Sequence, residues 1–229
     1  MTGVTDATDA TDATGATPPV PATPGDAWAE LAAGNARFAA DEALRPNADA
    51  AQRRRVSTGQ RPFAVVLGCS DSRVAAELVF DRGLGDLFVV RTAGHALDTA
   101  VLGSVEFATS VLGVPLLVVL GHDSCGAVSA ALTSRQDGSV PGGFVRDIVE
   151  RVTTSVLAAE HRGETGVDDI VREHVRATAR QLVERSEAVR EAVSAGRLGV
   201  VGATYTLADG LVQLVHAEGV ELADAPPAG

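Results

Sequence analysis

The chain has 229 residues, of which 45% are hydrophobic, so it is long enough to bury one substantial core. Its formal net charge is −11 at pH 7, which argues against nucleic acid or an anionic membrane surface as a partner, because both are bound by basic patches. The sequence has no apolar run of about 18 residues or more, so it predicts no membrane-spanning helix.

Residues 1–25 are rich in Thr, Asp, Ala and Pro and have neither the basic start nor the apolar stretch of a secretory signal. Their low hydrophobicity and their prolines predict a disordered tail. Without a signal, the cytoplasm is the default location, and it suits free thiols. The predicted domain covers residues 26–222, and residues 223–229 form a short C-terminal tail.

The first elements after the tail are helical. Asp26 is a candidate N-cap for a helix that runs to about residue 40, with Trp28 and Phe38 on or near one face. This amphipathic arm packs either on a partner chain or within its own chain, and the sequence leaves both interpretations open. A weaker helical pattern covers residues 49–58.

Strands and helices then alternate, and the strands are continuously apolar. Such strands are typical of a parallel sheet that helices cover on both faces. An Ala-Asp-Gly turn joins the last two strands, which predicts a hairpin or an edge strand. We therefore expect a single α/β domain with a mostly parallel central sheet, flanking helices and an N-terminal helical arm. The predicted strands are 63–67, 87–90, 115–120, 198–206 and 211–215, and the predicted helices are 74–80, 98–112, 124–133, 144–159 and 167–195.

Both cysteines of the chain follow apolar strands, in the segments Gly-Cys69-Ser-Asp71-Ser-Arg73 and Gly-His122-Asp-Ser-Cys125-Gly126. Ligands of α/β folds bind beyond the carboxyl ends of strands, which is where Cys69 and His122 stand. Two thiolates and an imidazole form a soft ligand set that suits zinc and leaves a fourth position. We expect His-x-x-Cys to place both side chains at the start of the next helix. Taken singly, these residues are also compatible with buried thiols, a disulfide or a structural histidine.

Asp71 lies two residues after Cys69 and can reach the same metal ion, while Arg73 can form a bidentate pair with its carboxylate. A structural ion pair at a strand-to-helix turn is the simpler interpretation. Beside a metal, the carboxylate held by Arg73 has a second use, because it can accept the hydrogen bond of zinc-bound hydroxide. It can also take the fourth metal position itself.

The combination of Cys-Ser-Asp-Ser-Arg with His-x-x-Cys-Gly resembles the β-class carbonic anhydrases, from about residue 27 to the final strand. These enzymes reversibly hydrate carbon dioxide to bicarbonate and a proton. The resemblance implies one zinc ion per subunit, bound by Cys69, His122 and Cys125. It also implies that Asp71 and Arg73 form the dyad that orients the zinc hydroxide nucleophile.

The resemblance also implies a substrate pocket. In the implied pocket, Gln60 hydrogen-bonds the substrate and stabilises the developing oxyanion, and Gly126 offers its backbone N–H to Asp71. Family members are dimers or larger with the cleft at the dimer interface, so a homodimer or tetramer is expected. The implied apolar positions of the cleft are Phe88, Phe107 and Ala93, although the two phenylalanines are also compatible with a simple core role.

Two positions depart from the family pattern. Arg91-Thr-Ala-Gly-His95 replaces a segment that often carries asparagines, so His95 is either a proton relay or a structural loop residue. Val66 stands where some bacterial members have the tryptophan of a regulatory bicarbonate site, although Arg91 matches the arginine of that site. Resemblance to part of the family implies a closed state of this site, in which Asp71 moves onto zinc below neutral pH.

Two other functions remain open at this point. The same fold also hydrolyses carbon disulfide or carbonyl sulfide, and a catalytically dead zinc module that acts by oligomerising is a third interpretation. The presence of Asp71, Arg73 and Gln60 favours carbon dioxide hydration, because a dead site has no need of them.

Overall fold

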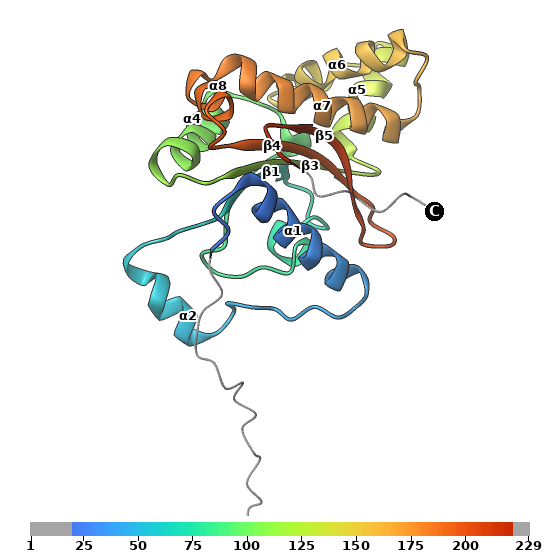
Figure 1. The fold of residues 1–229 in the computed structure, drawn as a ribbon. Helices are drawn as coiled ribbons and strands as arrows, with labels where there is room; N and C mark the ends of the chain where they lie inside the picture. The colour runs from blue at the N-terminus through green and yellow to red at the C-terminus, as the bar shows by residue number, and fades with distance from the viewer. Residues whose placement is uncertain (1–19, 222–229) are drawn as a thin grey trace, which may run out of the picture.

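The computed structural model describes residues 20–221, so the tail predictions for residues 1–19 and 222–229 lie outside the described part. Its centre is a five-stranded sheet in the order β2-β1-β3-β4-β5 (Figure 1). The first four strands in this chain are mutually parallel, and β5 pairs with β4 in the antiparallel direction. The mostly parallel α/β fold and the antiparallel edge are therefore confirmed. The strands are β1 (Ala64–Cys69), β2 (Leu87–Thr92), β3 (Leu116–His122), β4 (Gly199–Tyr205) and β5 (Val212–Glu218).

Helices cover both faces of the sheet because successive strand side chains point to opposite sides. Val65 and Leu67 of β1 join one apolar cluster with residues of α4 and α7, whereas Val66 joins a second cluster with α1 and α3. Figure 1 shows α1 and α2 on one side of the sheet and most other helices opposite them. The α-helices are α1 (Pro24–Ala39), α2 (Ala50–Arg55), α3 (Ala76–Val79), α4 (Thr99–Glu106), α5 (Gly126–Asp137), α6 (Val145–His161), α7 (Val167–Arg185) and α8 (Glu187–Ser194).

The helix predicted over residues 167–195 is wrong as a single element, because it breaks at Ser186. This residue has extended backbone angles and caps α8, since its hydroxyl accepts a hydrogen bond from the Val189 N–H at 3.2 Å. The same hydroxyl donates to Glu106 at 2.7 Å. Serine is favoured at the N-cap of a helix over the helix interior, because its hydroxyl can accept a hydrogen bond from a backbone N–H of the first turn.

Other predicted helices also differ in their bounds. The first begins at Pro24 and is capped by Thr23, so the prediction of Asp26 as its N-cap is wrong, because Asp26 lies in the first turn and its N–H donates to the Thr23 hydroxyl. The segment predicted as 98–112 changes from α4 to the π-helical turn η3 (Phe107–Val111). The segment predicted as 74–80 forms only the four-residue α3, because Ala75 still has extended backbone angles. The segment predicted as 49–58 is α2 followed by the 3₁₀ turn η1 (Val56–Thr58), and a further 3₁₀ turn, η2 (Ala93–His95), follows β2.

Helix α1 packs within its own chain, on the sheet face that also carries α3. Trp28 and Phe38 are partly buried against that apolar cluster, and the Phe38 ring lies 6.4 Å from the ring of Tyr205. The helix is also held by the buried Asn35, whose amide donates to the carbonyls of Val79 at 3.0 Å and Gly210 at 2.8 Å. Within residues 20–221, no helix has both the length and the apolar content needed to cross a bilayer.

Replacing Asn35 by alanine is expected to lower the free energy of unfolding by about 2–4 kcal/mol, because backbone groups of α3, of the turn before β5 and of β5 lose their hydrogen-bond partner. The third of these groups is the Val212 N–H, which donates to the Asn35 side-chain oxygen at 2.8 Å. Urea denaturation followed by circular dichroism measures the change. The matched control is Gln136→Ala, an exposed amide on α5, which should shift stability by less than about 0.5 kcal/mol. Equal stability of the two variants would contradict the expected role of Asn35.

Candidate metal centre

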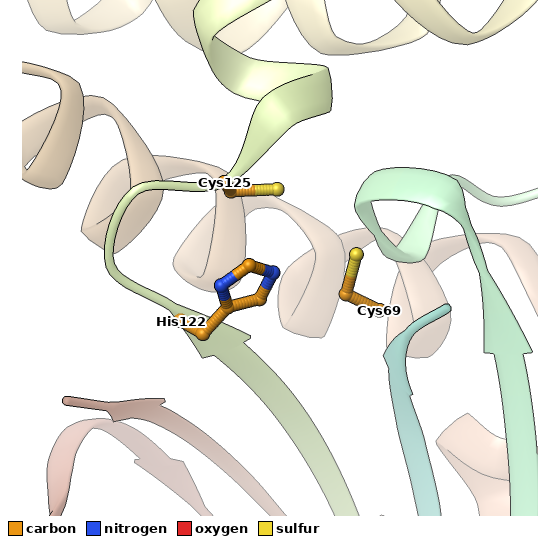
Figure 2. Close-up of side chains that lie close together, drawn as sticks. All are labelled: Cys69, His122 and Cys125. Atoms are coloured by element: carbon orange, nitrogen blue, oxygen red, sulfur yellow. The ribbon is translucent and has the colours of Figure 1, made fainter. Parts of the chain in front are cut away.

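The candidate centre forms where two neighbouring parallel strands end. β1 ends at Cys69 and β3 ends at His122, and the two strands are paired with Gly68 opposite Leu120. Cys125 is the N-cap residue of α5. Figure 2 shows the three side chains pointing toward one another, and their ligand atoms all lie within 4.8 Å of one another. The sequence motifs therefore converge in space.

The expectation that both His122 and Cys125 stand at the start of a helix is wrong for His122. That residue is the last of β3, and the chain then turns through Ser124, whose φ of 52° is left-handed, before α5 begins. Only Cys125 therefore lies at the helix N-terminus, where the first-turn N–H groups favour a thiolate.

The donor atoms fit a zinc ion. All three side chains are buried, with His122 fully inaccessible. The Nδ1 atom of His122 lies 2.8 Å from the Asp123 carbonyl, which can only accept a hydrogen bond, so Nδ1 carries a proton. Nε2 has no hydrogen-bond partner within residues 20–221 and is left to bind a proton or a metal ion. A buried, unpartnered ring nitrogen beside two sulfurs matches a three-ligand zinc site.

The two neighbouring thiols shift each other's pKa in opposite directions through a hydrogen bond. The bond from the Cys125 thiol lowers the pKa of Cys69 and so favours its thiolate form. The same bond, with burial, raises the pKa of Cys125. Burial works to lower the pKa of His122, but the neighbouring Cys69 sulfur outweighs it and the pKa is raised. The centre therefore attracts positive charge, and Cys125 would release its proton when a cation replaces it.

Asp71 is paired with Arg73 at the edge of this centre. The guanidinium donates from Nε to one carboxylate oxygen at 2.9 Å and from Nη2 to the other at 2.7 Å. The Arg73 backbone N–H adds a third bond at 3.0 Å. These bonds from Arg73 hold the pKa of Asp71 well below its usual range. The carboxylate stays close to the donor cluster, since one oxygen lies 3.9 Å from Nε2 of His122.

The bond expected from the Gly126 N–H to Asp71 is not among the hydrogen bonds found in residues 20–221, where Arg73 donates all three bonds to that carboxylate. Gly126 is the first residue of α5, and a Cβ placed on it would meet no atom within 4 Å. The space beside the Gly126 Cα is therefore open at this helix start.

Arg91 holds the segment that carries Cys69 and Asp71. Its Nε donates to the Cys69 carbonyl at 2.8 Å, and its Nη2 donates to the Asp71 carbonyl at 2.6 Å. In the sequence, Arg91 stands out only for its place in a family pattern, and that pattern does not indicate this contact. The signal that could have found it is register, because β1 and β2 pair with Gly68 opposite Arg91.

Gln60 is not brought to the centre within one chain. It is exposed and precedes β1, whereas Cys69 ends that strand. At about 3.3 Å per strand residue, the two ends of β1 lie roughly 16 Å apart. Phe88 is opposite Val65, also near the start of β1, and its ring lies 6.0 Å from that of Phe107. Of the predicted pocket residues, Ala93 lies at the same sheet edge as Cys69, which pairs with Thr92.

His95 has a structural environment. Its side chain is only 1% exposed, and within residues 20–221 neither ring nitrogen has a hydrogen-bond partner. Burial lowers its pKa well below the usual value, so the ring is neutral. A proton relay needs partners on both nitrogens, so the geometry favours the structural interpretation of this residue.

Comparisons with known proteins agree with this geometry. A family model described as carbonic anhydrase matches residues 64–212, which include all three donor residues. A carbonic anhydrase of Mycolicibacterium smegmatis is 56% identical over 191 residues, covering 83% of this chain and 93% of that protein. Carbonic anhydrase 2 of Mycobacterium tuberculosis is 54% identical over 187 residues, covering 82% and 90%. The solved Coccomyxa beta-carbonic anhydrase, a complex with acetazolamide, matches with a TM-score of 0.65 at 25% identity and covers 84% of each chain.

Proposed function

This chain belongs to the β class of the carbonic anhydrase family, and on that premise we propose that it hydrates carbon dioxide reversibly at the centre of Cys69, His122 and Cys125. The observation that carries the proposal is the convergence of these three donors within 4.8 Å of one another, at the ends of β1 and β3 and the start of α5. The products are bicarbonate and a proton. The test is carbon dioxide hydration by the purified protein, with its zinc content measured in the same sample.

One zinc ion per subunit would be held by the two sulfurs and by Nε2 of His122. When bound, zinc supplies a Lewis acid that brings the pKa of a water molecule to roughly 7 and so provides the nucleophile. Two hydrogen bonds already hold these ligand residues in place. The Asp123 carbonyl lies 2.8 Å from Nδ1 of His122, and Nε of Arg91 donates to the Cys69 carbonyl at 2.8 Å. Burial of the three donors keeps bulk water from competing for them.

Asp71 would orient the nucleophilic water. Arg73 holds the pKa of this carboxyl low, so the carboxylate is only an acceptor at neutral pH. An acceptor beside the donor cluster can hold the O–H of the water and direct a lone pair of its oxygen toward carbon dioxide. The two bonds from Arg73 also occupy both carboxylate oxygens, which disfavours Asp71 as a metal ligand itself. Crystal structures at low and high pH with Asp71 unmoved would exclude a closed state in which Asp71 binds zinc.

Gln60 would act in the site of a second copy of this chain. Within one chain it lies at the far end of β1 from Cys69, with Phe88 and Phe107 on the same side. Phe107 is 44% exposed and Val111, on the same turn, is 66% exposed, so this end of the sheet presents apolar surface that another copy can cover. We therefore assign a homodimer as the smallest active unit, with a tetramer as a pair of such dimers. We place the enzyme in the cytoplasm, where its two free thiols would persist.

Mixing subunits tests this assignment. Gln60→Ala is expected to lower kcat/KM about 100-fold, because a hydrogen-bond donor to the developing oxyanion is lost, while zinc content is unchanged. A heterodimer of one Gln60→Ala subunit and one Cys69→Ala subunit retains one complete site only if Gln60 acts across the interface. We expect such mixtures to be clearly more active than either parent, up to the limit set by the share of mixed dimers and by the one complete site in each of them. Mixtures as inactive as their parents would show that Gln60 does not act in trans.

A further inference from the structure

A chain of buried hydrogen bonds leads from His174 on α7 to the sulfur of Cys69. Nε2 of His174 lies 2.8 Å from the Gly94 carbonyl, and the Gly94 N–H donates to the Cys69 sulfur at 3.3 Å. On its other side, Nδ1 of His174 lies 2.8 Å from the hydroxyl of Ser155 on α6. His174 and Ser155 are 5% and 1% exposed, so water does not compete for these bonds. Four elements, α6, α7, η2 and β1, thus meet behind one candidate zinc ligand.

The direction of each bond follows from the chemistry of the groups. A carbonyl can only accept, so Nε2 of His174 carries the proton that is donated to Gly94. Burial lowers the pKa of His174 and keeps the ring neutral, so Nδ1 is an acceptor and the Ser155 hydroxyl donates to it. Ser155 therefore fixes the tautomer and orientation of His174, in the way that second partners orient functional histidines.

Gly94 has a backbone conformation that needs support. Its φ of 61° and ψ of 25° are left-handed, and a Cβ on it would lie 2.7 Å from the Cβ of Ala127. The next residue, His95, also has a left-handed φ of 42°, and its ring packs against His174 with ring centroids 4.4 Å apart. The turn that aims the Gly94 N–H at the sulfur is therefore held by the bond from His174 to the Gly94 carbonyl.

We propose that His174 is a positioning residue for the metal centre: by holding Gly94, it keeps an N–H aimed at the Cys69 sulfur and so fixes the orientation of that ligand and its capacity to donate charge to zinc. An N–H donated to a thiolate stabilises the negative charge on sulfur and restricts the directions in which its lone pairs face a metal. His174 touches neither substrate nor metal and acts only through Gly94. The inference rests on the proposed role of Cys69 as a zinc ligand.

Two variants separate this role from simple filling of the core. His174→Phe keeps a ring but removes the donor to Gly94, whereas His174→Gln retains an N–H at a similar reach. We expect His174→Phe to weaken zinc binding about 10- to 100-fold in chelator competition, which is typical for loss of an outer partner of a metal ligand. We expect His174→Gln to recover most of that loss. The matched control is His216→Gln, a histidine on β5 outside this chain of bonds, which should bind zinc as the parent protein does.

A spectroscopic measurement reports on the sulfur itself. In cobalt-substituted protein, the thiolate-to-metal charge-transfer band depends on the charge that sulfur donates, so His174→Phe should shift this band and His174→Gln should restore it. An unchanged band and unchanged zinc affinity in folded His174→Phe would overturn the proposal. If that variant does not fold, Ser155→Ala serves instead, since it frees the His174 tautomer; weaker zinc binding supports the proposal and unchanged binding overturns it.

Cys69→Ala, measured in parallel, distinguishes failure of this inference from failure of the proposed function. If Cys69→Ala loses zinc while His174→Phe binds it like the parent protein, the metal site stands and the positioning role is wrong. If Cys69→Ala binds zinc like the parent protein, Cys69 is not a ligand, and both proposals fall together.

Discussion

Replacing Cys69 by alanine is expected to remove bound zinc and to abolish carbon dioxide hydration. The centre offers three protein donors, and loss of one sulfur leaves a site with only two, which is too few to hold zinc at cellular concentrations. Cys125 would also lose the neighbouring sulfur of Cys69, which is its hydrogen-bond partner. We expect zinc, measured by elemental analysis after dialysis, to fall from one ion per chain to near zero, and kcat to fall by more than about 1,000-fold.

The same result is expected for His122→Ala, because its Nε2 is the third donor and has no other partner in the described part of the chain. Ser129→Ala, one turn into α5 from Cys125, is the matched control and should keep full zinc content and activity. An active, zinc-free Cys69→Ala protein would refute the assignment of the centre. A zinc-loaded but inactive Cys69→Ala protein would show that Cys69 is needed for catalysis and not for zinc binding.

Replacing Asp71 by asparagine is expected to lower kcat about 100- to 1,000-fold while the zinc content stays at one ion per chain. Asparagine has the shape of the carboxylate but lacks its charge, so the two charge-assisted bonds from Arg73 are weakened. Its amide can also present a donor where the nucleophilic water needs an acceptor. The separation of activity from zinc content distinguishes Asp71 from the three metal donors.

Stopped-flow hydration and elemental analysis of the same sample measure both quantities. Asp137→Asn, an exposed carboxylate at the end of α5, is the control for loss of one negative charge. A fall in kcat for the control as large as for Asp71→Asn would indicate a general effect of charge. Unchanged kcat in Asp71→Asn would mean that the ion pair with Arg73 is only structural.

The strands and the convergence of the metal donors could be predicted from the sequence. Continuous apolar runs identify buried parallel strands, and parallel strands bring their carboxyl ends to one edge. Cys69 and His122 therefore had to lie near each other once both were placed at strand ends, and Cys125 follows after three residues. The ion pair of Asp71 with Arg73 could also be predicted, because the two residues are only two positions apart in the sequence.

Features that depend on distant contacts could not be predicted. At the break at Ser186, the hydroxyl also donates a hydrogen bond to Glu106, a residue far away in the sequence. His174 reaches Cys69 only because α7 packs behind η2, and no spacing in the sequence signals that contact. Gln60 was assigned to the site by family resemblance. Its distance from Cys69 within one chain follows only from the length of β1, which lies between them.

The most direct test of the central claim is the stopped-flow rate of carbon dioxide hydration by the full chain, measured across pH with zinc quantified in the same sample. We expect the rate to be proportional to zinc content, to disappear when a chelator removes the metal, and to return when zinc is restored. Hydration by a zinc-free sample, or none by a fully zinc-loaded one, would contradict a catalytic zinc centre at Cys69, His122 and Cys125.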